Sequence, residues 1–307
     1  MKIYFAPMEG ITGYIFRNAY DKYYGGIDKY FAPFISPADN CAMNPKEKRD
    51  NLPDNNRVKH LVPQILTCKP HHFIDAAKVL SEMGYREINL NLGCPSGTVC
   101  AKGKGAGFLS ETDELEAFLE RIYDYATNNN IKISIKTRIG RYNPEEWYDL
   151  VDIYNKFPVY ELIVHPRIRE DYYKEKPRMS YFYYAMEHSK NPVVYNGDLF
   201  SVCDVKRLEK CENIMLGRGL LYNPELPEQL DNIKECKFSD TKCFRQFHDE
   251  IYHEYQKIMS PDINVLYRMK ELWTYWSRLF PENNREIKKL LKSKHYSEYE
   301  IYLNQIL

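Results

Sequence analysis

The stretch EINLNLGCPSG (residues 87–97) decides the fold. Its first half is a short, largely apolar run with the length of a buried β-strand, and its second half is a turn built on glycine, cysteine and proline. Seven more runs of this kind occur along the chain. The eight predicted strands are Ile3–Ala6, Lys29–Phe34, Leu61–Leu66, Glu87–Leu92, Lys132–Thr137, Glu161–Val164, Pro192–Tyr195 and Asn213–Leu216.

Several segments between these strands have the apolar spacing of amphipathic helices. They are residues 71–83, 112–127, 144–156 and 201–210. Asn143 is expected to cap the third of them, because Pro144 suits a first helical turn. A strand followed by a helix, repeated eight times, is typical of a (β/α)8 TIM barrel. We therefore predict an α/β protein whose residues 1–237 form such a barrel.

From about residue 238 the pattern predicts helices alone. They are expected near residues 240–259, 263–279, 284–294 and 297–306. Ser297 and Glu300 have the spacing of a capping box at the start of the last one. We predict a small C-terminal all-helical domain, residues 238–307.

The stretch 268–294 is locally basic, with eight Lys and Arg against three acidic residues. The whole chain, in contrast, has 43 basic and 43 acidic residues, so any contact with a polyanion must be local. Two interpretations stay open from the residues alone. The stretch is either a surface that contacts phosphates, with Tyr267, Trp273, Tyr275 and Trp276 nearby, or a solvated face over an aromatic core.

The composition indicates an ordinary globular protein, with 44% apolar and 28% charged residues in 307. No apolar stretch approaches the roughly 18 residues of a membrane span, so no segment is expected to cross a membrane. The cysteine pattern suits a reducing compartment, so we expect a cytoplasmic protein, and separately we expect a monomer. The cysteines form no C-x-x-C pair, so we expect neither a disulfide framework nor a metal site. They are Cys41, Cys68, Cys94, Cys100, Cys203, Cys211, Cys236 and Cys243.

Polar residues stand at the ends of these otherwise apolar strands. They are Gln64, Asn91, Lys136, His165, Asn196, Gly217 and Arg218. In a parallel barrel the carboxyl ends of all strands meet at one rim, where the active sites of this fold lie. The connection after Asn91 is lengthened, and its GCPSGTVCAKGKGAG segment (93–107) is expected to form a mobile flap over the site.

Three features of this rim carry chemistry. Asn196-Gly197-Asp198 and Gly217-Arg218-Gly219 follow the last two strands, where barrels commonly bind phosphate. Lys136 ends an interior strand, where it can neutralise electron density on a ring or an anion. Cys94 lies in a rim turn, and an unperturbed thiol with a pKa of about 8.5 suits a general acid at least as well as a nucleophile.

Seven motifs of the chain, in this order, resemble those of the tRNA-dihydrouridine synthases. They are FAPMEGITG (5–13), VPQILTC (62–68), NLNLGCPSG (89–97), ISIKTRIG (133–140), LIVHPRIR (162–169), VVYNGD (193–198) and IMLGRGLLYNP (214–224). The resemblance implies a TIM barrel that holds FMN, followed by a helical domain that grips tRNA. It also implies a flavin-dependent oxidoreductase that reduces the C5–C6 double bond of a uridine, with the D-loop as the expected region.

The resemblance also assigns roles to individual residues. The residues it implies for the cofactor are Pro7, Met8, Gln64, Lys136, His165, Asn196, Gly197, Asp198, Gly217 and Arg218. Those expected to contact the tRNA are Asn91, Arg167, Arg268, Lys270, Arg285, Lys288, Lys289 and Lys292. In the implied reaction NADPH reduces FMN, hydride passes from flavin N5 to uracil C6, and Cys94 donates a proton to C5.

Some choices stay open at this point. Gly13 stands where many family members have Asp, and Pro166 replaces a usual Gly, so the sequence does not decide which uridine is reduced. Two other functions are considered. One is an FMN-dependent TIM-barrel reductase of a small molecule, with a purely structural tail, and the other is a non-catalytic RNA-binding protein on a degenerate barrel.

Overall fold

The computed structural model describes residues 1–208, 211–232, 238 and 240–307. Its strands form one sheet in which every pair is parallel. They are β1 (Lys2–Phe5), β2 (Lys29–Phe31), β3 (Leu61–Val62), β4 (Gln64–Ile65), β5 (Glu87–Leu92), β6 (Lys132–Arg138), β7 (Leu162–His165), β8 (Val193–Asn196) and β9 (Asn213–Leu216). All eight predicted strands are confirmed, with the third one divided in two.

The two strands at the ends of the sheet are consecutive in the sequence, which brings the two edges of the sheet together. The strand order is β3-β2-β1-β9-β8-β7-β6-β5-β4, and only Pro63 separates β3 from β4. Proline has no N–H to donate, which interrupts the strand. Its carbonyl still accepts a hydrogen bond from the N–H of Asn89 at 2.8 Å. The predicted TIM barrel is therefore confirmed.

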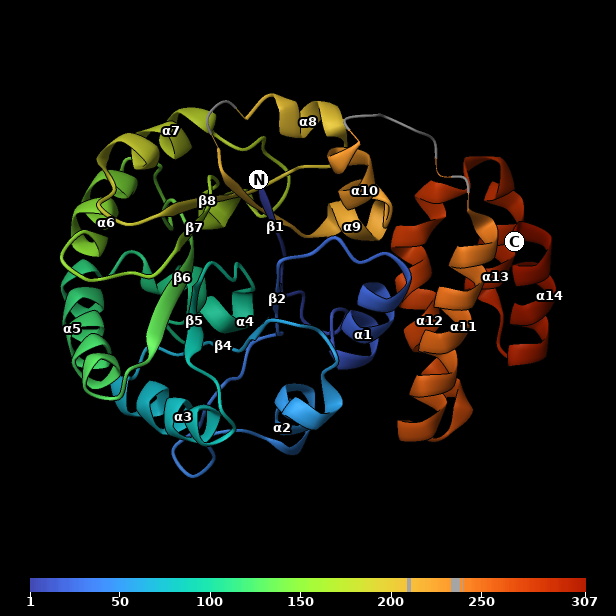
Figure 1. Ribbon diagram of the computed structural model, residues 1–307, viewed down its shortest axis with the longest axis horizontal. Coiled ribbons are helices and arrows are strands. Elements are labelled where there is room, and N and C mark those ends of the chain that lie inside the picture. Colours follow the sequence, from blue (N-terminus) through green and yellow to red (C-terminus); the bar gives the residue numbers. More distant parts are fainter. Residues whose placement is uncertain (209–210, 233–237, 239) are drawn as a thin grey trace. The chain divides into compact units, whose positions relative to one another are not determined.

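Helices cover the outside of the strands (Figure 1). They include α2 (Pro45–Asn51), α3 (Pro70–Glu82), α5 (Thr112–Asn128), α6 (Glu146–Tyr154) and α7 (Met179–His188). The short helix α4 (Gly97–Cys100) instead lies inside the ring that these helices form in Figure 1. Since both faces of the sheet are covered, β5 is buried along its whole length. An apolar cluster contributed largely by strands lies in the core, formed by Tyr4, Ala6, Phe31, Val62, Ile163, Val194 and Met215.

The predicted cap at Asn143 is wrong. α6 begins at Glu146, and no side chain caps its first turn. Instead the Glu146 carboxylate accepts hydrogen bonds from the backbone N–H groups of Arg141, Tyr142 and Asn143, at 2.7, 2.9 and 2.8 Å. A carboxylate with four lone-pair sites can satisfy several N–H groups at once, which one amide oxygen does less well.

The chain divides into two compact units, and all strands belong to the first: Met1–Gly10, Asp28–Asp198 and Lys210–Leu216. The second contains Ile11–Ile27, Leu199–Glu209 and Gly217–Leu307. Its helices are α1 (Tyr14–Tyr23), α8 (Val202–Lys206), α9 (Arg218–Tyr222), α10 (Leu226–Asp231), α11 (Thr241–Ile258), α12 (Asp262–Trp276), α13 (Asn284–Lys292) and α14 (Tyr296–Ile306). The C-terminal helices are thus confirmed. The boundary predicted between residues 237 and 238, and the end of the helix predicted at 201–210, fall on residues outside the described part.

An aromatic core holds the second unit together. Phe244 and Trp276 meet edge to face with ring centroids 5.2 Å apart, and both side chains are buried. Buried Tyr299 binds two neighbours through its hydroxyl, His248 Nε2 at 2.6 Å and Trp273 Nε1 at 2.7 Å. The predicted capping box at Ser297 is wrong, because α14 already begins at Tyr296.

Within the described ranges, no helix has both the length and the apolar character needed to cross a membrane.

Candidate active site

Rim residues of neighbouring strands lie side by side. Asn91 on β5 is in register with Lys136 on β6, and Arg138 is in register with His165 on β7. Pro7 and Met8 follow β1 and are half-buried. The topology therefore brings together polar side chains that are far apart in the sequence.

A chain of amide hydrogen bonds fixes the orientation of Gln64. Asn89 Nδ2 donates to Ser134 Oγ at 2.9 Å, and Gln64 Nε2 donates to Asn89 Oδ1 at 2.7 Å. Asn91 Nδ2 in turn donates to Gln64 Oε1, also at 2.7 Å. A glutamine amide has two donors and two acceptor sites, so the bonds to Asn89 and Asn91 use one of each and fix the orientation of this buried side chain.

The same chain positions the turn that carries Cys94. Asn91 Oδ1 accepts the backbone N–H of Gly93 at 3.0 Å and that of Cys94 at 2.9 Å. An asparagine that bonds the backbone two or three residues further on forms an Asx-type turn. The predicted contact of Asn91 with substrate stays a prediction, and the structure gives this side chain a positioning role as well.

The glycine-rich segment after Cys94 folds back on it. The Cys94 carbonyl accepts the Ala106 N–H at 3.1 Å and the Cys100 thiol at 3.4 Å. A Cβ at Gly107 would stand 2.6 Å from Cys100 Cα, and one at Gly105, where φ is +57°, would stand 2.9 Å from the Cys94 oxygen. The glycines therefore permit a tightly packed loop. That this loop moves as a flap over the site stays a prediction.

Burial raises the pKa of the Cys94 thiol, an effect partly opposed by a backbone hydrogen bond from Ser96 and by the positive charges of Arg138 and Lys136. The thiol is half-buried, and neither it nor any other cysteine among the described residues forms a disulfide. Cys236 lies outside the described residues. At neutral pH Cys94 thus holds a proton that it can give to a neighbouring base.

Lys136 provides a cation without a protein counter-charge. Burial, with the nearby Arg138 guanidinium, lowers the pKa of Lys136 to about 8, and only the Cys94 sulfur acts in the other direction. In the part of the chain that is described, its ammonium forms neither a hydrogen bond nor an ion pair. An electron-rich or anionic ligand edge would supply the missing partner.

His165, Arg167 and Asp198 form a second cluster on this rim. Arg167 Nη1 donates to His165 Nε2 at 2.9 Å, and its guanidinium forms a bidentate ion pair with the Asp198 carboxylate. Because a guanidinium can only donate, Nε2 is the acceptor and His165 carries its proton on Nδ1. Arg167 is only 1% exposed, so it holds its two partners in place. Its predicted contact with the tRNA stays a prediction.

Arg138 is a further residue of this rim that the sequence did not predict, and its side chain is buried. It donates to the carbonyls of Gly93 at 3.1 Å, Ile168 at 2.8 Å and Tyr172 at 2.8 Å. It thereby ties the Cys94 turn to the loop after β7. The available signal was its spacing: residues two apart on a strand point to the same side, so a functional Lys136 directs attention to Arg138.

The predicted phosphate loops have different surroundings. Asn196 donates to the Met215 carbonyl at 2.8 Å, and a Cβ at Gly197 would stand 2.4 Å from the Tyr195 hydroxyl, so position 197 has room only for glycine. Gly217 directly follows β9, and the Arg218 guanidinium lies 5.6 Å from the centre of the Phe200 ring in the second unit. Their joint contact with a phosphate stays a prediction.

The basic stretch supplies an exposed helical face. On α13, Ile287 and Leu290 are buried, whereas Arg285, Lys288, Lys289 and Lys292 are exposed. On α12, Arg268 pairs with Glu271 at 2.5 Å, and Lys270 donates to the Ser293 carbonyl at 2.9 Å. Trp273 and Trp276 belong to the aromatic core and are not available for stacking on bases.

Among solved structures, a morphinone reductase in complex with tetrahydroNAD has a similar fold, with a TM-score of 0.55 at 8% identity over 79% of this chain and 90% of that one. Among curated relatives, the tRNA-dihydrouridine(16) synthase of Pseudomonas putida is 29% identical over 92% of this chain and 90% of its own length. A probable tRNA-dihydrouridine synthase of Staphylococcus aureus is 27% identical over 82% and 77%. The model described as "Dihydrouridine synthase (Dus)" matches residues 4–300.

The barrel fold, together with the family match over residues 4–300, places this chain among the flavin-dependent oxidoreductases. More particularly, the chain belongs to the dihydrouridine synthase family, whose model spans almost all of it. The family resemblance found in the sequence motifs is therefore confirmed.

Proposed function

We propose that this protein reduces the C5–C6 double bond of a uridine in tRNA, with FMN as its cofactor and NADPH as the reductant. The observation that carries the proposal is the position of the Cys94 thiol, in the turn held by Asn91 and at the rim where Lys136 also lies. Burial raises the pKa of this thiol and so favours its protonated form. The curated relatives named above are tRNA-dihydrouridine synthases, which supports tRNA as the substrate. Cytoplasmic location and a monomeric state stay predictions.

The rim residues fit a flavin. Among the described residues the Lys136 ammonium has no hydrogen-bond or ion-pair partner, so it is free to pair with an electron-rich ring. Buried Gln64 is held in one orientation by Asn89 and Asn91 and would supply an amide group to the polar edge of that ring. We assign Pro7, Met8 and His165 to the cofactor as well, and the loops at Asn196–Asp198 and Gly217–Arg218 to its phosphate. When bound, FMN supplies the hydride that is added to uracil C6, after NADPH has reduced it.

Cys94 completes the reduction by donating its proton to C5. Hydride addition at C6 leaves negative charge on C5 and the adjacent carbonyl, and a positioned acid removes that charge. Burial keeps the thiol protonated, while Arg138 and Lys136 stabilise the thiolate that forms. One residue therefore holds its proton before the reaction and can still release it during the reaction.

The substrate base must leave the RNA stack to reach this rim. The exposed cations of α13 offer contacts for the phosphate backbone, which contributes most of the affinity in such complexes. Three relatives are named for position 16, so that position in the D-loop is the first uridine to test.

Mass-spectrometric mapping of dihydrouridine in tRNA from cells that lack this protein tests the proposal. One D-loop position is expected to carry unmodified uridine, and expression of the wild-type protein should restore the modification there. The Cys94→Ala protein should not restore it. A complete modification pattern in the deleted cells, with no other family member present, would contradict the proposed activity.

The pH dependence of flavin binding tests the role of Lys136. Its pKa is lowered to about 8 in the free protein, so the ammonium is present below that pH and is lost as the pH rises through it. A hydrogen bond to a charged group contributes about 1.5–3 kcal/mol, so flavin affinity should fall roughly tenfold or more above pH 8. Flavin fluorescence titrations between pH 6.5 and pH 9.5 measure this decline.

Lys136→Met should bind flavin weakly at every pH and show no inflection near pH 8. Lys132→Met is the matched control, because Lys132 lies on the same strand and is exposed. An inflection that persists in Lys136→Met would mean that another group titrates.

A further inference from the structure

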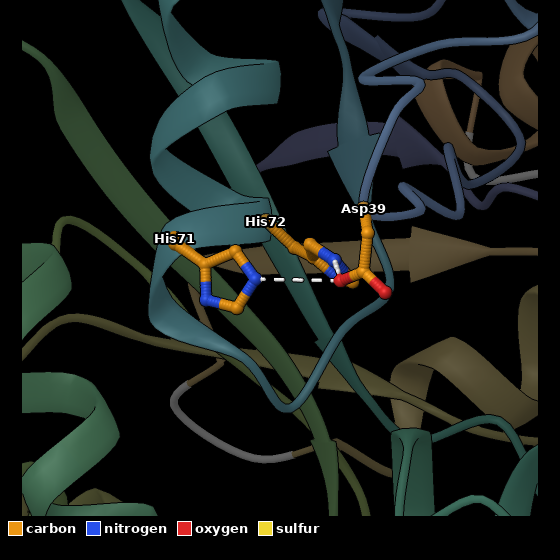
Figure 2. A group of neighbouring side chains, drawn as sticks. All are labelled: Asp39, His71 and His72. Carbon is orange, nitrogen blue, oxygen red and sulfur yellow. Dashed lines mark hydrogen bonds and ion pairs between the residues drawn. The ribbon is translucent and has the colours of Figure 1, made fainter.

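Asp39, His71 and His72 form a cluster of potential metal ligands in the barrel unit (Figure 2). Asp39 lies in the connection after β2, and the two histidines lie in the first turn of α3. Both imidazole rings point toward the same carboxylate oxygen. Asp39 Oδ1 is 2.8 Å from His72 Nε2 and 3.6 Å from His71 Nε2, and the three ligand atoms lie within 4.8 Å of one another.

These separations suit a single transition-metal ion. Zinc bound by His nitrogen and carboxylate oxygen at about 2.0–2.2 Å in tetrahedral geometry has ligand atoms about 3.3 Å apart. The separations of Asp39 Oδ1 from His72 Nε2 and His71 Nε2, 2.8 and 3.6 Å, lie on either side of that value, and the shorter one is a hydrogen bond that a bound metal ion would replace. We propose that Asp39, His71 and His72 bind a divalent ion of the zinc type, with water completing the coordination.

The donor set selects the kind of metal. Two imidazoles and one carboxylate suit Zn²⁺ or its neighbours in the transition series, whereas Mg²⁺ and Ca²⁺ prefer oxygen ligands alone. The cysteine spacing predicts no metal site, and nothing in the sequence places Asp39 beside two histidines that lie far along the chain.

Two features set the strength of the site. Lys69 Nζ lies 3.3 Å from Asp39 Oδ1, so a metal ion must displace this exposed ammonium. Metal-binding histidines usually donate their second ring N–H to a partner, and loss of such a partner typically weakens metal affinity 10- to 100-fold. His72 Nδ1 is buried and has no hydrogen-bond partner among the described residues. The site therefore binds its metal exchangeably, more weakly than a structural zinc site does.

The cluster joins two segments, and each of them contacts the glycine-rich segment after Cys94. Ser36 lies three residues before Asp39, and its Oγ accepts a hydrogen bond from Lys104 Nζ at 3.3 Å. Cys68 lies three residues before His71, and its thiol donates to the Lys102 carbonyl at 3.7 Å. Lys102 and Lys104 both belong to the loop that folds back on Cys94. A bound metal would hold these two neighbouring segments together.

Titration of the tag-free, full-length protein with Co²⁺, read by visible absorption and by competition with Zn²⁺, tests the proposal. One equivalent is expected to bind. Asp39→Asn and His71→Ala should each weaken binding at least tenfold, and both positions are exposed, so both variants should fold. Because metal binding is measured directly, the result does not depend on the proposed reaction.

His253→Ala is the matched control, since it removes an exposed histidine on α11 that belongs to no such cluster in the described part. It should bind Co²⁺ as the wild type does. Lys69→Ala should bind several-fold more tightly, because the competing ammonium is gone. The proposal is overturned if the wild type binds no Co²⁺, if Asp39→Asn and His71→Ala bind it as well as the wild type, or if Lys69→Ala binds it no more tightly.

Discussion

Cys94→Ala protein is expected to bind flavin and to have that flavin reduced by NADPH as in the wild type. It should nevertheless form dihydrouridine roughly 10²- to 10⁴-fold more slowly. The loss follows from the removal of the proton donor, because no other described thiol lies in this turn. Single-turnover reactions of the reduced protein with unmodified tRNA measure the affected step. Stopped-flow reduction by NADPH in the absence of tRNA measures the step that should not change.

Two variants separate the acid from the packing of its loop. Cys94→Ser keeps nearly the same shape, but a hydroxyl is a much weaker acid than a thiol, so its rate should be about as low as that of Cys94→Ala. Cys41→Ala removes an exposed cysteine of the connection after β2 and should react normally. A Cys94→Ser protein with near wild-type rates would rule out the proton transfer.

The strand positions could be predicted because each barrel strand has a recognisable local pattern in the sequence. Short strand-like runs such as Glu87–Leu92 are buried on both faces, and polar side chains such as Asn91 and Lys136 stand where a run reaches the rim. The break at Pro63 was hidden within a single apolar run. α7 was missed because its ten residues, MSYFYYAMEH, bury only Phe182 and Ala185 and so show little helical periodicity.

The hydrogen bonds of the site could not be predicted, because they depend on which loops meet at the rim. Arg138 binds carbonyls of two separate loops, and Arg167 is buried by its ion pair with Asp198. In a sequence both look like surface cations, since arginine is rarely buried without a partner. Their partners lie in the loops after β5, β7 and β8, which only the folded barrel brings together.

Reversal of the charges on α13 should abolish tRNA reduction at about 0.15 M salt without changing flavin reduction. Arg285, Lys288 and Lys292 are exposed, and none of them forms a hydrogen bond or ion pair within the described residues. Each phosphate contact contributes about one unit to the slope of log affinity against log salt. Replacing all three by Glu should therefore flatten that slope by roughly three units, as measured by filter binding of tRNA at several salt concentrations.

The matched control reverses three exposed cations outside this stretch, Lys2, Arg121 and Lys190, whose side chains also lack partners in the described part of the chain. It changes the net charge by the same amount, so a general loss of attraction for RNA would weaken both proteins equally. A selective loss in the α13 variant means that this face contacts the backbone. Equal affinities in the two variants would instead favour the solvated face over an aromatic core, because total charge alone would then account for binding.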